Sequence, residues 1–177
     1  MVGEKGVLES KETVDDVFVE CQGQKVLIKK GRYYTRDHMW VEVTPENNFR
    51  VGVTDYAQRF LKALVSLVAI ERNDTTDSDV RKGEKFGCIY GRYYRVMDSR
   101  EYGCTAFDLI APLSGRIVEV NSKVMDKPEL INRDPYGEGW IALIEADDLE
   151  SCRKGLIACE GYKRVIADRR QSPFREL

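Results

Sequence analysis

Histidine is almost absent from this sequence, since His38 is the only one among 177 residues. Histidine catalysis or metal binding requires partner cysteines or carboxylates at recognisable spacing, and His38 has none. The five cysteines form no close-spaced pair, which is unlike a secreted disulfide framework. A glycine-rich phosphate loop and a nucleophile elbow are missing as well. We therefore expect no catalytic residues, no metal site and no enzyme activity, and we interpret His38 as structural.

Long hydrophobic runs and a strong net charge are also missing. No stretch approaches eighteen consecutive apolar residues, and residues 1–10 are polar and mixed in charge, unlike a signal peptide. The 28 basic residues nearly cancel the 30 acidic ones, which leaves no general reason to bind nucleic acid or an anionic membrane. A hydrophobic content of 42% is typical of a globular domain. These features predict a cytoplasmic globular protein without a membrane partner.

The most informative stretch runs from Phe86 to Val120. Both of its ends are rich in β-branched and aromatic residues, and the polar segment Met97-Asp98-Ser99-Arg100 lies between them. This pattern predicts a β-hairpin over residues 86–112. With Asp98-Ser99 as its turn, we expect Tyr93 to face Cys104 and Arg95 to face Tyr102.

The N-terminal half contains the other predicted strands and one helix. Two β-prone runs within residues 15–30 flank Gln22-Gly23-Gln24 and predict a small hairpin. Strands are expected over residues 32–43, 49–53 and 64–70. Between the last two, Thr54 can cap a helix whose first turn contains Asp55 and whose apolar stripe is typical of a helix packed on a sheet.

Beyond the hairpin, the segment from Lys127 to Trp140 contains two prolines and two glycines and predicts a rigid loop. Trp140 is expected to begin a strand and to bury its indole in the core. A terminal helix should begin at Asp147-Asp148, and Gly161 should separate it from a second helix that ends near Asp168. Cys152 and Cys159 are interpreted as core residues of this helical segment.

Several of these runs resemble the glycine cleavage system H-protein family of lipoyl-type domains. They are Val51-Gly52-Val53-Thr54-Asp55-Tyr56-Ala57-Gln58, Asp108-Leu109-Ile110-Ala111-Pro112-Leu113-Ser114-Gly115, Val118-Glu119-Val120-Asn121 and Asp134-Pro135-Tyr136-Gly137-Glu138-Gly139-Trp140. The resemblance implies a mainly β fold, a lipoyl-domain β-sandwich or barrel-sandwich hybrid with an inserted helix and C-terminal helices. It covers residues 32–168, with an N-terminal extension over 1–31 and a C-terminal tail over 169–177.

In that family, a lysine at the hairpin tip carries lipoamide between enzymes. Here, counting back from Asp108 places the lysine position at Cys104, and counting forward from Phe86 places it at Tyr93. The two counts disagree because the hairpin is longer by about eleven residues, and residues 94–103 are interpreted as the insertion. No lysine occurs between Lys85 and Lys123. Since lipoate is attached through an amide to a lysine amine, we expect no lipoate on the hairpin and no other cofactor.

Two groups of residues remain as candidates for binding. Tyrosine and arginine on a protruding element suit recognition of a protein partner, and they can also stack with a nucleotide or a single strand. The binding candidates on the hairpin are Arg92, Tyr94, Arg95, Arg100 and Tyr102. The resemblance further implies that the loop containing Asp134, Tyr136 and Glu138 shapes the surface beside the hairpin.

Three functions are compatible with this sequence. The first is a non-catalytic binding or scaffold module for lipoyl-handling or glycine cleavage enzymes. The second is a carrier that uses the Cys104 thiol or a lysine elsewhere, such as Lys85. The alternative interpretation of Cys104 is a small apolar residue that only fills its place in a strand. The third is nucleotide or nucleic-acid binding through the Tyr/Arg-rich hairpin, which the nearly neutral charge makes the weakest of the three.

Overall fold

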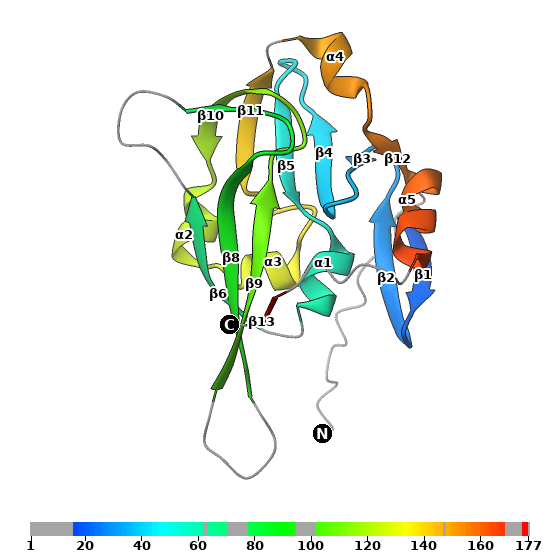
Figure 1. The fold of residues 1–177 in the computed structure, drawn as a ribbon, viewed down its shortest axis with the longest axis vertical. Coiled ribbons are helices and arrows are strands. Elements are labelled where there is room, and N and C mark those ends of the chain that lie inside the picture. The colour runs from blue at the N-terminus through cyan, green and yellow to red at the C-terminus, as the bar shows by residue number, and fades with distance from the viewer. Residues whose placement is uncertain are drawn as a thin grey trace, which may run out of the picture.

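The computed structural model describes residues 16–61, 64–70, 78–94, 102–146, 148–168 and 175–176. Within them, strands form three antiparallel sheets and confirm the predicted mainly β sandwich (Figure 1). The seven-stranded sheet has the order β12 (Ile157–Ala158), β3 (Tyr33–Tyr34), β4 (Met39–Val43), β5 (Phe49–Val53), β11 (Ala142–Ala146), β10 (Gly115–Val120) and β7 (Asp79–Val80). The four-stranded sheet has the order β13 (Arg175–Glu176), β9 (Tyr102–Ile110), β8 (Lys85–Tyr94) and β6 (Leu64–Ile70). The third sheet is the hairpin of β1 (Asp16–Cys21) and β2 (Gln24–Lys29).

The main core lies between the two larger sheets. Alternate residues of β4 and β5, such as Val41 and Val51, face Ile89 of β8 and Phe107 of β9 within one cluster of buried side chains. In a strand, successive side chains point to opposite faces, so one face of each strand supplies this cluster. The packing fixes the base of the β8–β9 hairpin against the body of the protein.

Helix α1 (Asp55–Phe60) follows β5 as the sequence predicts. The Thr54 hydroxyl accepts a hydrogen bond from the Ala57 amide at 3.2 Å and caps the helix. Asp55 lies in the first turn, where its charge is favourable, but it is also buried at 3% exposure. Its Oδ2 accepts a hydrogen bond from the Leu27 amide of β2 at 2.7 Å, which ties the N-terminal hairpin to the helix.

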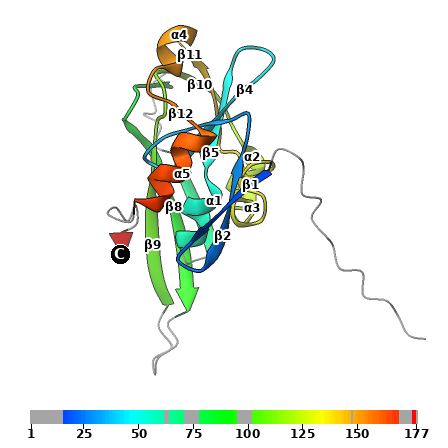
Figure 2. The same cartoon turned by 90° about the vertical axis from the view of Figure 1, so that its right-hand side faces the viewer.

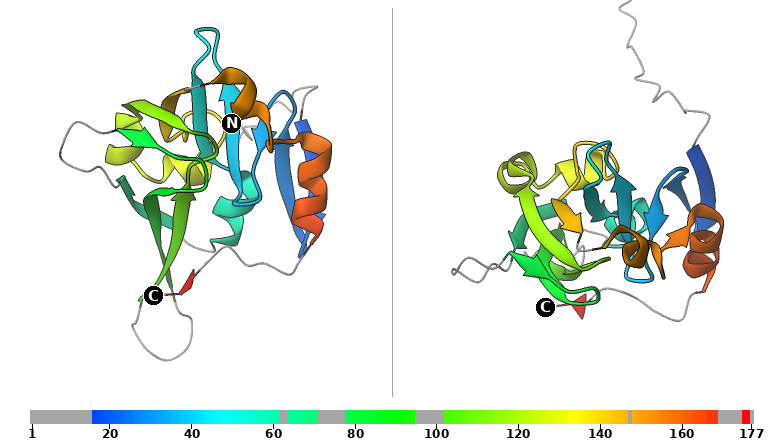
Figure 3. Two further views of the ribbon diagram at one scale, coloured as in Figure 1. Left: turned by 45° about the horizontal axis from the view of Figure 1, so that its top comes forward. Right: turned by 90° about the horizontal axis from the view of Figure 1, so that it is seen from above.

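A second, aromatic core lies on the opposite face of β3 and β4. It brings together the β1–β2 hairpin, α1 and the C-terminal helix α5 (Cys159–Ala167), which lie side by side in Figures 2 and 3. Trp40 is completely buried in it, and its indole N–H donates to the Pro135 carbonyl at 2.9 Å. Gly52 on β5 leaves the space for this ring, since a Cβ there would lie 2.8 Å from the indole.

His38 belongs to the same aromatic core and is buried, in keeping with a structural role. Its Nδ1 lies 2.8 Å from the Tyr162 hydroxyl, and the Thr54 hydroxyl lies 2.9 Å from the same oxygen. Tyr162 also stacks on Tyr34 at 4.4 Å between ring centroids. These contacts tie α5 to the strands across more than a hundred residues of sequence.

The segment before β11 differs from the sequence prediction. Trp140 lies outside the strand, which begins at Ala142, and its indole is only half-buried beside the second core. The fully buried tryptophan is Trp40. The loop from Lys127 to Trp140 also contains a short helix, α3 (Leu130–Arg133), preceded by α2 (Ser122–Asp126).

The C-terminal helices are divided at a different glycine from the one predicted. Helix α4 (Leu149–Arg153) ends before Gly155, which adopts a φ of +85° that other residues rarely tolerate. Strand β12 follows, and Gly161 lies inside α5. Cys152 therefore packs in the main core, whereas Cys159 packs beside the aromatic one.

Candidate functional site

The candidate site is the hairpin of β8 and β9, which extends beyond the body of the protein in Figures 1 and 2. Within the described residues, strand β6 pairs with β8 as far as Leu64, which faces Arg92. The β8–β9 ladder continues through Tyr93 and Tyr94. The predicted hairpin over residues 86–112 is therefore confirmed for its described strands, β8 and β9, which form the β8–β9 ribbon.

The predicted register of this ribbon is wrong by one residue. Tyr93 faces Gly103, and Cys104 faces Arg92, whereas Tyr94 faces Tyr102. All pairs from Gly87–Leu109 outward to Tyr94–Tyr102 share one register, which leaves an odd number of residues between Tyr94 and Tyr102, whereas a two-residue turn at Asp98-Ser99 requires an even number. The correction places the side chains of Arg92 and Cys104 on the same face of the ribbon.

The register explains the two counts of the lysine position. Cys104 and Tyr93 lie in adjacent rows of the ladder, so both counts lead to the same place in the hairpin. There the ladder continues through a further pair, Tyr94 and Tyr102. Cys104 is a free cysteine of intermediate burial, and Arg92 opposite it is exposed. A thiol and a guanidinium therefore lie where the resemblance places the lipoyl lysine.

Lys85, the other residue named as a carrier, lies at the opposite end of the hairpin. It is the first residue of β8, faces Ile110, and its ammonium group lies 3.4 Å from Asp108 Oδ1. Both side chains are 34% exposed. Lys85 is thus at the base of the ribbon and far along the strand from the position of the lipoyl lysine.

The remaining hairpin candidates are placed only in part. Arg95 and Arg100 lie outside the described residues, so their predicted binding role, and the predicted pairing of Arg95 with Tyr102, have no structural counterpart here. Tyr94 and Tyr102 face each other as the outermost described pair of the ladder. Their role in binding stays a prediction.

The loop that contains Asp134 and Glu138 is held by internal hydrogen bonds, but one of its residues is not at the surface. Both oxygens of the Asp134 carboxylate accept backbone hydrogen bonds, from Gly137 and Glu138, at 2.9 Å. Asp134 and Glu138 are exposed. Tyr136 is instead buried at 3% exposure, and its hydroxyl donates to the Leu27 carbonyl at 2.9 Å. Its inclusion among the surface candidates is therefore wrong, because it anchors the N-terminal hairpin.

Burial shifts the pKa values of side chains in the aromatic core. It lowers the pKa of His38 to about 4 and raises the pKa of the Tyr162 hydroxyl well above its usual value. His38 is thus neutral at pH 7. A neutral imidazole and a protonated phenol can form the observed hydrogen bond without placing a charge in the core.

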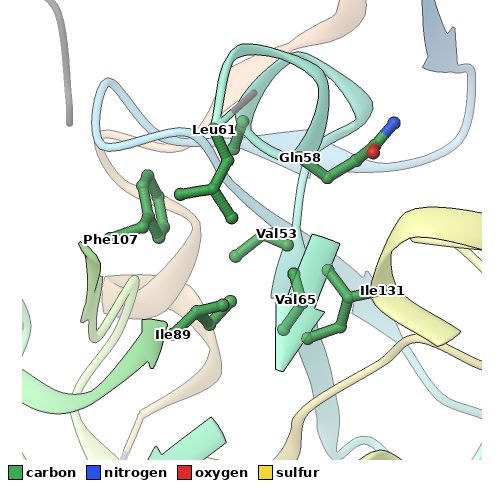
Figure 4. Close-up of a pocket in the computed structure, with 8 residues that line it drawn as sticks. Val53, Gln58, Leu61, Val65, Ile89, Phe107 and Ile131 are labelled. Atoms are coloured by element: carbon green, nitrogen blue, oxygen red, sulfur yellow. The ribbon is translucent and has the colours of Figure 1, made fainter. Parts of the chain in front are cut away.

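A small apolar hollow lies between the sheets near the base of the hairpin. Its lining includes Val53, Leu61, Val65, Ile89 and Phe107, and Gln58 lies at its edge (Figure 4). Its empty volume, which includes open solvent, is about 170 Å³. Because these are side chains of the main core, we interpret the hollow as a packing gap.

Comparison with known proteins agrees with the observed fold. The profile of the family described as "Glycine cleavage H-protein" matches residues 32–169. This chain belongs to the glycine cleavage H-protein family. The matched range begins after the β1–β2 hairpin and includes the β8–β9 ribbon, the Asp134–Trp140 loop and α5.

Individual H proteins support the assignment. The chain is 37% identical to the glycine cleavage system H protein of Coprothermobacter proteolyticus over 143 residues, which cover 80% of this chain and 98% of that protein. It is 36% identical to the probable glycine cleavage system H protein 1 of Saccharolobus solfataricus over 147 residues, 83% of this chain and 96% of that one. The crystal structure of the H protein from Mycobacterium marinum aligns with a TM-score of 0.58 and 31% identity, covering 76% of this chain and 95% of that one.

Among the described residues, no group of three or more histidine, cysteine, aspartate or glutamate side chains is arranged to hold a metal ion. No helix in the described part of the chain is long and apolar enough to cross a membrane.

Proposed function

We propose that this H-protein family member is a non-catalytic binding or scaffold module for lipoyl-handling or glycine cleavage enzymes. Its hairpin carries no lipoate. The proposal rests on the pair of β8 and β9 residues at which the lipoyl lysine is expected. This pair is Arg92 and Cys104, and neither residue is a lysine. An amide to lipoate requires a primary amine, which neither side chain supplies.

The shape of the hairpin supports a binding role. The strands remain paired beyond the expected lysine position, and this ribbon is rich in tyrosine and arginine. Such residues are frequent anchors of protein interfaces. A two-stranded hairpin is only marginally stable on its own, so the retention of a long one is better explained by contacts with a partner than by stability.

Lipoylation is tested by intact-mass and tryptic mass spectrometry after expression with a lipoate ligase. We expect no lipoyl mass on any peptide of the wild-type hairpin. The positive control is Cys104→Lys, which restores an amine at the counted position. A lipoyl adduct on a lysine of the wild-type chain would contradict the scaffold proposal and support a carrier.

Partner binding is tested with a shortened ribbon. The observed register requires Tyr93 and Gly103 to flank a tight turn, so residues 94–102 are replaced by Asn-Gly, a pair suited to a two-residue hairpin turn. Binding to purified glycine cleavage enzymes and lipoate ligase should fall at least about tenfold, because the candidate anchors Tyr94, Arg95, Arg100 and Tyr102 are removed. The control is Arg153→Gln on α4, an exposed residue at the opposite end of the protein from the ribbon (Figure 1). Equal binding by the shortened and control proteins would show that the ribbon is not part of the interface.

A second function, a carrier that uses Cys104, is favoured by one observation. The thiol is free, only partly buried, and lies opposite the exposed Arg92. If Cys104 is the carrier residue, mass spectrometry of the native protein should detect a covalent adduct. The substitution Cys104→Ser should abolish that adduct. If the native protein has its unmodified mass, the carrier function is excluded for the thiol.

A further inference from the structure

A row of charged side chains crosses the seven-stranded sheet beside the aromatic core. Glu42 on β4 lies between two arginines, since its Oε1 accepts from Arg32 and its Oε2 from Arg50, both at 3.1 Å. Arg50 faces Glu42 in the β4–β5 register, and Arg32 immediately precedes β3. The three side chains therefore form one continuous row on one face of the sheet.

Aromatic rings hold both guanidinium groups in place. Arg32 lies over the Trp40 ring at 4.4 Å and over Tyr136 at 5.3 Å, and Arg50 lies over Trp140 at 5.6 Å. Such stacking fixes the plane of a guanidinium and leaves its edge available for hydrogen bonds. The exposure of the side chains rises along the row, from 13% for Arg32 to 31% for Glu42 and 42% for Arg50.

The row has more donors than acceptors. Among the described side chains, only two buried nitrogen or oxygen atoms have no hydrogen-bond partner, and they are Arg32 Nη1 and Arg50 Nε. Both belong to this row, and both oxygens of Glu42 are already used. Buried donors are nearly always paired with protein or water, so two unpaired donors on the two arginines that flank Glu42 point to an acceptor outside the described chain.

We propose that this row, Arg32–Glu42–Arg50, is a binding site for one carboxylate group. Two guanidinium groups and one carboxylate leave a single positive charge, which one carboxylate neutralises and a phosphate dianion would overcompensate. A carboxylate is also flat and accepts two hydrogen bonds from a guanidinium edge, as Glu42 already does from two sides. Arg50 is the most exposed member of the row and is therefore the side from which an incoming group reaches it.

The carboxylate comes either from a small free acid or from an acidic side chain of a protein. The row lies on β4 and β5, beside the rigid loop that ends at Trp140, and is separate from the β8–β9 ribbon. The inference is therefore independent of the proposed function, and it does not depend on whether the hairpin carries lipoate.

The test follows the arginine Nε–Hε and Trp140 indole N–H resonances by NMR during titration with sodium acetate. Sodium chloride at equal ionic strength is the reference, and an acetylated, amidated peptide containing glutamate is the second ligand. We expect saturable shifts with acetate, with the peptide, or with both. Saturation with acetate alone identifies a free acid as the source, and saturation with the peptide alone identifies a protein side chain.

Three variants assign the site. Arg50→Gln should weaken binding at least about tenfold, because it removes one of the two charged donors. Glu42→Gln should strengthen binding at least about threefold, because it removes the internal competitor, and unfolding cannot produce a gain of this kind. The control is Arg116→Gln on β10, an exposed arginine whose Nη2 lies 3.6 Å from Glu145 Oε2.

Two results would overturn the proposal. Shifts that are linear or equal to those with chloride would show that only water meets the unpaired donors. Weakening of the same size in Arg50→Gln and Arg116→Gln would show that the effect belongs to the net charge and not to the row.

Discussion

At the scale of single residues, His38 gives the aromatic core its response to acid. Burial lowers its pKa to about 4, so the unfolded chain binds a proton near pH 6.5 while the folded chain stays neutral. Its contribution to stability is complete above about pH 6.5 and is lost as the pH falls towards 4. Between pH 7 and pH 4.5 the wild type should lose about 2 kcal/mol more than His38→Asn.

Urea denaturation at the two pH values measures that difference. Asparagine suits the position because His38 has a φ of +59°, a conformation that asparagine tolerates better than most residues. The carboxylates titrate in both proteins and cancel in the comparison. If the free energies of unfolding of both proteins fall equally, the imidazole is not held neutral by the fold.

The two tryptophans should differ in their effect on stability. Trp40→Ala should cost about 3–5 kcal/mol, because it empties a fully buried site and leaves the Pro135 carbonyl without its donor. Trp140→Ala should cost about 1–2 kcal/mol, since that ring is half-buried at the edge of the second core. Each variant is the control for the other in urea denaturation. Equal losses would mean that exposure does not govern the contribution of these rings.

At the scale of elements, the N-terminal hairpin is part of the folded body although the family match begins after it. Val26 and Ile28 are completely buried in the aromatic core, and the Tyr34 hydroxyl donates to the Lys29 carbonyl at 2.6 Å. Deleting residues 1–30 should therefore lower the free energy of unfolding by about 2–4 kcal/mol, as expected for losing two buried aliphatic side chains.

Thermal unfolding of the truncated and full-length proteins checks this prediction. The control deletion, residues 1–15, leaves both strands of the hairpin intact, so the difference between the two deletions measures the contribution of the strands. A truncated protein as stable as the full chain would show that the hairpin is an independent addition.

Elements marked by local patterns could be predicted from the sequence, and those set by distant contacts could not. The cap at Thr54 and the alternation in residues 86–112 define α1 and the β8–β9 hairpin without help from the rest of the chain. The register of that hairpin depends on the length of the connection at its tip, and the division of the C-terminal helices depends on which of two glycines, Gly155 or Gly161, adopts a positive φ. Neither choice is decided by the local sequence.

At the scale of the whole molecule, family resemblance predicted the sandwich, because its motifs lie in strands and loops of the main core. The candidate site was predicted less completely. The position of Cys104 follows from counting, but the burial of Tyr136 and the row around Glu42 arise from strands and loops that only the folded chain brings together. From the sequence, the Arg32–Glu42–Arg50 row could be suspected only from charged residues at alternate positions of the predicted strands. The sequence does not show which of these strands are neighbours.

The aromatic core also determines when the chain can finish folding. It joins residues from the first and last parts of the described chain, and the Cys21 thiol contacts the Ile166 carbonyl at 3.8 Å across 145 residues. Contacts of such long sequence separation form late, because the intervening chain must first be ordered. During synthesis, the β1–β2 strands must therefore wait for α5 to leave the ribosome. Until then their apolar face is a place where a chaperone, or another unfinished chain, can bind.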